Sequence, residues 1–220
     1  MARLSSQGDL FAAAPALPEG LAYQPEFITR AEEQHLVAAI AGLPLRPMLY
    51  RRGSTTSGSL PMYEARRRIL SFGSSYDYSQ NRLQPAPPIP DFLHPLRERV
   101  ASWLGIAPDD FEHALLTEYP PGTPIGWHRD TPDFEVVVGI SLAGRCRMRF
   151  RPYPHVPHRT HATLELDLAP RSAYVIRGTA RWRWQHHIPP TPEHRYSITF
   201  RTPSARNKGA RHGGRTPRTI

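Results

Sequence analysis

The sequence predicts a mainly β fold, an antiparallel sandwich or barrel with flanking helices, and three observations support this prediction. Proline makes up 25 of the 220 residues, more than twice its ordinary share of about 5%, which disfavours long helices and favours short strands joined by stiff loops. From about residue 111, short apolar or alternating runs follow one another, as expected of strands. They cover 114–119, 134–142, 145–151, 162–168, 172–177 and 195–201. Turn-forming residues separate them, as at Ala143-Gly144 and Pro189-Pro190.

Two helices are expected ahead of these strands. Thr29 and Glu32 have the spacing of a capping box, in which each side chain accepts a hydrogen bond from an exposed backbone N–H of the other residue. The helix that begins there is expected to end near Gly42, because apolar residues recur at helical spacing up to that point. A second helix is expected after Pro90-Asp91 and should end at Gly105, since glycine commonly terminates helices.

The chain divides into four segments within one structural domain. Residues 1–20 form an Ala/Pro-rich arm, and residues 21–110 hold the two helices and a polar loop, Gly53–Ser59. Residues 111–203 form the β core. Residues 204–220 are rich in Arg, Gly and Thr with almost no apolar side chains, so this basic tail is expected to be disordered.

Charge and cysteine content limit the classes of function without selecting one. The net charge is +9, and Lys208 is the only lysine among the 28 basic residues. Arginine suits phosphates and carboxylates, which permits a nucleic-acid partner, although a GC-rich coding sequence would produce the same bias. The single cysteine, Cys146, excludes an intramolecular disulfide and a Cys-rich zinc site. No apolar run reaches the length of a membrane span, so we expect a soluble cytoplasmic protein. We also expect it to be a monomer.

The most informative motif is His128-x-Asp130. Side chains alternate along an extended chain, so His128 and Asp130 lie on the same face and can offer a nitrogen and an oxygen to one metal ion. A distal histidine, His186 or His187, would complete the two-histidine, one-carboxylate triad that binds non-haem iron(II) and leaves coordination positions open. The alternative is that His128 and Asp130 form a hydrogen-bonded pair on the surface.

An alternating strand at 195–201 supplies a second element. One face of this strand carries Arg195, Ser197, Thr199 and Arg201. Two arginines on an otherwise small, polar face need an anionic partner or solvent, and a dicarboxylate would be such a partner through bidentate contacts. The alternative is that Arg195 satisfies a nearby carboxylate such as Glu193.

Taken in order, these motifs resemble the AlkB family of Fe(II)/2-oxoglutarate-dependent dioxygenases. The resemblance covers roughly residues 111–201, with a weaker likeness from about residue 18. It rests on Tyr119-x-x-Gly122, His128-x-Asp130, His186 and Arg195-x5-Arg201, which stand in the family's order. It implies a double-stranded β-helix (jelly roll) core on which segment 21–110 packs as an extension that covers the substrate. It also implies Fe(II), 2-oxoglutarate and O2 as cofactors.

The resemblance gives individual residues a role. His128, Asp130 and His186 would bind the iron and carry catalysis, with His186 preferred over His187 because of the Trp-x-His-x-Ile spacing. Arg195 would bind the distal carboxylate of 2-oxoglutarate.

Three further residues would contact the co-substrate. Arg201 would lie beside the oxo-acid end of 2-oxoglutarate, and Tyr119 would donate a hydrogen bond to it. Thr117 stands where the family usually has an Asn, so this contact would differ from the family pattern.

The implied reaction is oxidative demethylation of alkylated bases, such as 1-methyladenine or 3-methylcytosine, in DNA or RNA, with release of formaldehyde, succinate and CO2. A base must leave its stack to reach the metal, and it then needs stacking partners and a charged path for the backbone. The candidate substrate-binding residues are Trp127, Tyr76, Tyr78, Arg66, Arg67 and Arg68. Ordinary packing or surface positions are the alternative for each.

Other functions stay open at this point. The same chemistry could act on tRNA modifications or on a protein side chain, and a non-catalytic β-sandwich could bind nucleic acid through its arginines alone. A basic row on the strand that carries Cys146 bears on this choice; it consists of Arg145, Arg147, Arg149 and Arg151. Such a row needs either a phosphate backbone or acidic neighbours, for which Glu165 and Asp167 are candidates.

Overall fold

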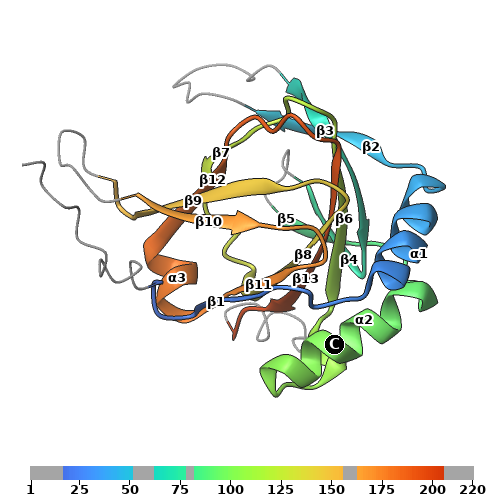
Figure 1. Ribbon diagram of the computed structural model, residues 1–220. Helices are drawn as coiled ribbons and strands as arrows, with labels where there is room; N and C mark the ends of the chain where they lie inside the picture. Colours follow the sequence, from blue (N-terminus) through green and yellow to red (C-terminus); the bar gives the residue numbers. More distant parts are fainter. Residues whose placement is uncertain (1–16, 52–61, 78–81, 156–162, 206–220) are drawn as a thin grey trace, which may run out of the picture.

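Two antiparallel sheets face each other in the computed structural model, which describes residues 17–51, 62–77, 82–155 and 163–205 (Figure 1). The larger sheet has seven strands in the order β1 (Leu21–Gln24), β11 (Ala173–Ile176), β8 (Phe134–Leu142), β13 (Arg195–Pro203), β6 (His113–Tyr119), β3 (Met62–Phe72) and β2 (Arg46–Arg51). The smaller sheet has four strands in the order β10 (Leu164–Leu168), β9 (Cys146–Pro152), β12 (Trp184–Ile188) and β7 (Ile125–His128). This is the predicted jelly-roll architecture, mainly β with flanking helices.

The two longer helices cover the face of the larger sheet that points away from the smaller one. In Figure 1, α1 (Arg30–Ala41) and α2 (His94–Leu104) lie side by side against that sheet, away from the smaller one. Four short elements complete the described fold: the hairpin of β4 (Ser74–Asp77) and β5 (Arg82–Pro85), the turns η1 (Asp91–Leu93) and η2 (Pro108–Asp110), and helix α3 (Gly178–Arg183) before β12.

Alternation along the strands creates two separate apolar cores. Leu116, Ile140 and Ile198 point to the helices and form one core with side chains of α1 and α2. Residues on the opposite face of the larger sheet point to the smaller sheet, where Val137 and Phe150 belong to the second core. Between the sheets, this second face also carries polar side chains, and these build the site described below.

Both predicted helices are present, with the expected ends. The capping box is complete, because Glu32 N donates to the side chain of Thr29 while Thr29 N donates to the side chain of Glu32. Helix α2 ends at Gly105, which adopts a left-handed conformation (φ 68°) that most residues avoid.

The structure adds strands that the sequence pattern did not predict. The stretch 45–65 was expected to contain a polar loop, but β2 and β3 flank that loop and extend the larger sheet. Strands β7 and β12 were missed as well. They have only four and five residues, too few to display a clear period of two.

Some predictions concern residues outside the described part. These are the arm up to residue 16, the loop Gly53–Ser59, Tyr78 and the tail from residue 206. Within the described ranges, each helix is too short or too polar to span a membrane.

Candidate metal and co-substrate site

Pairing within the smaller sheet brings the predicted triad together. His128 at the end of β7 is the register partner of His186 in β12, and their ring centroids lie 4.2 Å apart. Asp130 follows two residues later. One ligand atom from each of His128, Asp130 and His186 lies within 4.8 Å of the other two. The alternative of a His–Asp pair on the surface does not hold, because only 10% of the Asp130 side chain is exposed and its carboxylate is paired with Arg201.

Hydrogen bonds orient two of the three ligands. Nδ1 of His128 lies 2.8 Å from the carbonyl oxygen of Gly126, so an N–H at Nδ1 leaves the lone pair of Nε2 available to a metal. Arg201 donates to Oδ1 of Asp130 from Nε (3.1 Å) and from Nη2 (2.8 Å). The second carboxylate oxygen, Oδ2, lies 3.7 Å from Nε2 of His186.

The protonation states suit a divalent cation. Burial and the neighbouring His128 lower the pKa of His186 to about 3, so its imidazole is neutral. Burial also lowers the pKa of His128. Burial alone would raise the pKa of Asp130, but Arg201 and the other basic groups around the carboxylate together outweigh it and hold that pKa well below its usual range. Neutral imidazoles and an ionised carboxylate are the forms that bind metal.

The neighbouring histidine, His187, faces away from the triad. Because side chains alternate along β12, its ring lies on the outer face of the smaller sheet and stacks on Trp127, with centroids 5.0 Å apart. Trp127 also lies under the guanidinium of Arg151, at 4.4 Å. The geometry therefore brings His186, not His187, to the metal site. It also puts Trp127 on the face of β7 opposite to His128.

A second arginine, Arg195, is buried between the sheets. It is 2% exposed, its Nε donates to Oγ of Ser141 at 3.2 Å, and its guanidinium lies 4.8 Å from the ring centre of Tyr119. Glu193 is not its partner, since that carboxylate accepts from the backbone N–H of Arg145. In the described residues Arg195 has no ion pair, and a buried guanidinium without a counter-ion is costly. It therefore fits the carboxylate of a bound ligand.

Register places the remaining co-substrate candidates beside the arginines. Strand β13 pairs with β6 so that Arg195 is opposite Tyr119 and Ser197 is opposite Thr117. The hydroxyls of Tyr119 and Ser197 lie 3.5 Å apart. Thr117 is buried on the same polar face.

Several residues of this region were not predicted from the sequence. Ser141 binds Arg195 from β8, and His113 lies 3.3 Å from Nη1 of Arg201 through Nδ1. Arg181 of α3 is 2% exposed, and its Nη2 donates to the carbonyl oxygens of Asp130 (3.1 Å) and Phe134 (2.9 Å). The alternation of β8 could have indicated the inward position of Ser141. Nothing local pointed to Arg181.

The three consecutive arginines of β3 have different surroundings. Arg66 donates to the carbonyl oxygens of Pro121 and Gly122. Arg68 pairs with Glu118. Arg67 donates to the sulfur of Met48.

Tyr76, another candidate for stacking, lies in the hairpin β4–β5. There it pairs with Leu83 in a two-stranded sheet, outside the two sheets that hold the triad and the buried arginines.

Acidic neighbours account for part of the arginine row on β9. Arg147 pairs with Asp167 and Glu165, and Arg149 pairs with Glu165. Arg151 instead donates to the side-chain oxygen of Gln185. The alternation of β9 and β10 had indicated these ion pairs.

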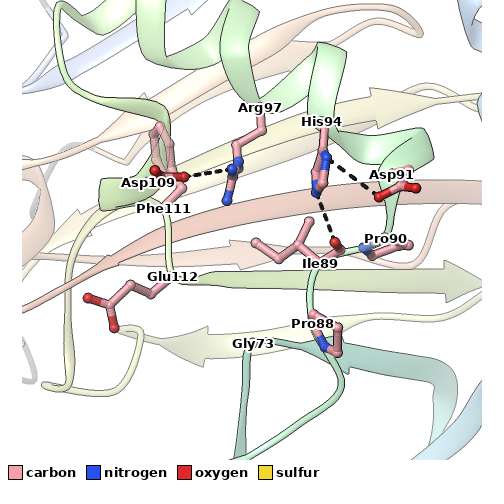
Figure 2. Close-up of a pocket in the computed structure, with 10 residues that line it drawn as sticks. All are labelled: Gly73, Pro88, Ile89, Pro90, Asp91, His94, Arg97, Asp109, Phe111 and Glu112. Carbon is pink, nitrogen blue, oxygen red and sulfur yellow. Dashed lines mark hydrogen bonds and ion pairs between the residues drawn. The ribbon is translucent and has the colours of Figure 1, made fainter.

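A hollow lies on the helix side of the larger sheet, at the start of α2 (Figure 2), and its volume is about 660 Å³. Two pairs of its side chains interact: Arg97 with Asp109, and His94 with Asp91. The hollow is lined by residues 73, 88–91, 94, 97, 109 and 111–112. It contains none of the triad residues and none of the buried arginines.

The site's donor set fits an iron(II) centre with a dicarboxylate co-substrate. Two neutral imidazoles and one carboxylate on one side of the position form the facial triad typical of non-haem iron. Arg201, already bound to Asp130, and the buried Arg195, which has no ion pair within the described residues, would supply two cations for the two carboxylates of 2-oxoglutarate. Fold and site together therefore define a jelly-roll oxygenase.

Sequence comparison identifies the family. The sequence model of the 2OG-Fe(II) oxygenase superfamily matches residues 20–201, so the chain belongs to that superfamily, and its relatives are of the AlkB type. The proteins of this superfamily are dioxygenases that use Fe(II), 2-oxoglutarate and O2.

Individual relatives agree with this assignment. The "Alkylated DNA repair protein ALKBH8 homolog" of Arabidopsis thaliana is 29% identical over 191 residues, 77% of this chain and 51% of that protein. The "tRNA (carboxymethyluridine(34)-5-O)-methyltransferase ALKBH8" of Mus musculus is 26% identical over 180 residues, 80% of this chain and 25% of that protein. The chain thus spans about half the length of the Arabidopsis relative and about a quarter of the length of the mouse relative.

A solved structure supports the fold. "The structure of OsALKBH1" matches with a TM-score of 0.62 and 15% identity, over 85% of this chain and 98% of that chain.

Proposed function

We propose that this protein oxidatively demethylates alkylated nucleobases, such as 1-methyladenine and 3-methylcytosine, in DNA or RNA, with release of formaldehyde, succinate and CO2. The observation that carries the proposal is the assembled triad of His128, Asp130 and His186 beside two inward arginines, Arg195 and Arg201. Iron(II) with 2-oxoglutarate and O2 supplies the oxidising power for hydroxylating a methyl group on a base nitrogen, after which the hydroxymethyl group leaves as formaldehyde.

The chain's own residues bind and orient the reactants. The buried guanidinium of Arg195, held by Ser141, would bind the distal carboxylate of 2-oxoglutarate. Arg201 would hold the orientation of Asp130 and neutralise charge at the oxo-acid end. The ring of Tyr174, which lies against Gly139 between the sheets, helps to exclude water there.

Nucleic acid is the favoured substrate for two reasons. The Arabidopsis relative is named as a repair protein for alkylated DNA and the mouse relative as a tRNA methyltransferase. In addition, arginines on β3 give the chain a positive strand beside the strand that carries Tyr119. A target base would have to be extruded or single-stranded to reach the triad.

A second candidate keeps the chemistry and changes the substrate to a modified tRNA base. The name of the mouse relative favours it. Oxidation of a protein side chain has no comparable support. The assembled triad argues against a non-catalytic nucleic-acid-binding sandwich.

The test uses purified protein with Fe(II), 2-oxoglutarate and air. DNA and RNA oligonucleotides that carry 1-methyladenine or 3-methylcytosine are incubated in parallel with bulk tRNA, and products are read by mass spectrometry. His128→Ala is the inactive variant, and His187→Ala is its matched control, because His187 faces away from the triad. Demethylation by wild type and by His187→Ala, with none by His128→Ala, would support the proposal. Succinate release without demethylation of any oligonucleotide would contradict it, and oxidation confined to tRNA would favour the second candidate.

A further inference from the structure

Three consecutive arginines on β3 differ in how fully their hydrogen-bonding capacity is used. Arg68 forms an ion pair with Glu118, which also contacts His194 at 2.9 Å. Arg66 donates to two backbone carbonyl oxygens. Both arginines therefore have strong acceptors within the protein.

Arg67 has no such acceptor among the residues that the structure describes. Its Nε lies 3.2 Å from the sulfur of Met48, and one Nη contacts the same atom. A thioether is a weak acceptor, and the charge of Arg67, which is half-buried, meets no carboxylate in the described ranges. The guanidinium is thus held in place while much of its hydrogen-bonding capacity stays available.

The register of β3 turns Arg67 toward the metal site. Arg68 pairs with Glu118 and Ile69 with Thr117 in the adjacent strand β6. Exposure alternates along β3 from Arg66 to Ile69, so Arg67 shares the face of Ile69 and of its partner Thr117, between the sheets. Its positive charge is also close enough to contribute to the lowered pKa of His128.

The positive charge of Arg67 has no negative partner among the charges that we assign to the metal and co-substrate site. Asp130 is already paired with Arg201, and Arg195 and Arg201 match the two carboxylates of 2-oxoglutarate. An additional guanidinium beside the triad can then bind a further anion, and a nucleic-acid substrate would supply one. A planar guanidinium binds phosphate oxygens with two parallel hydrogen bonds.

We propose that Arg67 binds the phosphate group next to the target base and so selects nucleotides over free nucleosides. This proposal rests on the proposed function, because it assumes a nucleic-acid substrate. The sulfur of Met48 holds the guanidinium in place, and the phosphate supplies the strong acceptor that the thioether does not.

The first test measures binding of a methylated oligonucleotide with Fe(II) and 2-oxoglutarate under anaerobic conditions. Arg67→Gln is compared with wild type and with Arg183→Gln, which removes an exposed positive charge at the end of α3, far from β3 in Figure 1. We expect Arg67→Gln to weaken binding about tenfold or more and to reduce the slope of log K against log[salt] by about 0.7–0.9, the value of one lost phosphate contact. Arg183→Gln should stay within about twofold of wild type.

The second test separates the phosphate from the base. Demethylation of 1-methyladenosine and of its 5′-monophosphate is compared in wild type and in Arg67→Gln. Wild type should prefer the monophosphate, and Arg67→Gln should abolish this preference by raising KM for the monophosphate alone. Equal losses on both substrates would mean that Arg67 contacts the base, and would overturn the proposal.

The outcomes also separate the two proposals. If wild type repairs oligonucleotides and Arg67→Gln matches Arg183→Gln, only the role of Arg67 is wrong. If wild type consumes 2-oxoglutarate but oxidises no nucleic acid, the proposed function and the role of Arg67 both fail. Unfolding temperature and anaerobic 2-oxoglutarate binding should be unchanged in Arg67→Gln. If they change, Arg67→Lys serves instead, since it keeps the charge, loses the planar fork, and should show a smaller loss in the same direction.

Discussion

Arg201 holds Asp130 through two hydrogen bonds, in which Nε and Nη2 of the arginine both donate to the same carboxylate oxygen, Oδ1. This contact leaves Oδ2 directed to His186. A single arginine would therefore select which oxygen of Asp130 is offered to a metal, and we propose that it also supplies a positive charge at the oxo-acid end of the co-substrate.

Replacing Arg201 should weaken metal binding without unfolding the protein. In Arg201→Lys the charge remains but the fork geometry is lost, so the carboxylate can rotate. Partners that orient metal ligands typically contribute about 10–100-fold in metal affinity, and we expect a loss in that range. Titration with Mn(II), followed by electron paramagnetic resonance, measures the dissociation constant. An unchanged constant would mean that Asp130 is oriented by other groups.

The two neighbouring histidines of β12 should behave differently. His186→Ala removes a ligand and should reduce bound iron to a trace. His187→Ala removes a ring that stacks on Trp127 outside the sheet and should leave one iron per chain. Metal content after anaerobic loading and desalting compares the two variants directly. Loss of iron from His187→Ala together with its retention in His186→Ala would contradict the assignment.

Arg195 should affect the co-substrate and not the metal. Arg195→Met keeps a long apolar side chain in a buried position but removes the charge, so the affinity for 2-oxoglutarate should fall about 100-fold or more, as expected for loss of a buried charged hydrogen bond. Ser141→Ala, which removes one acceptor from that guanidinium, should have a smaller effect in the same direction. Calorimetry with Mn(II)-loaded protein gives the dissociation constant of 2-oxoglutarate for both variants. The affinity of each variant for Mn(II) should stay near the wild-type value.

Gly139 should tolerate no side chain. A Cβ at this position would lie 2.3 Å from the Tyr174 ring, which is 8% exposed and packed between the sheets. Gly139→Ala should therefore lower the free energy of unfolding by about 1–3 kcal/mol, as expected of overpacking. Gly126→Ala is the matched control, because a Cβ there meets nothing within 4 Å. Urea denaturation measures both variants, and equal stabilities would show that the ring moves at no cost.

Glu32 should make stability depend on pH in acid. Its hydrogen bonds with Arg99, then with Thr29, lower its pKa to about 2 from an ordinary 4.5. The unfolded chain therefore takes up a proton at higher pH than the folded protein does, so the stabilisation is present above about pH 4.5 and disappears as pH falls toward 2. The difference in unfolding free energy between wild type and Glu32→Gln should shrink over this range and shrink with added salt. A difference that does not vary with pH would contradict the assignment.

Local patterns in the sequence determined much of this protein. The capping box of Thr29 and Glu32, the glycine at 105 and the alternation of the core strands each depend on neighbouring residues, so helix ends and strand faces could be predicted. The spacing of His128 and Asp130 also placed two ligands on one face. The order of motifs then predicted the distal histidine and the co-substrate arginines through family resemblance.

Only the tertiary structure decided which side chains meet across strands. Which strands pair, and in which register, decides several contacts of the site. These are the two hydrogen bonds of Arg201 to Asp130, the support of Arg195 by Ser141, and the different surroundings of Arg66, Arg67 and Arg68. A period of two says which face a residue occupies but not which residue of another strand lies opposite. The short strands β7 and β12 carry even less local signal, and their pairing is what joins His128 to His186.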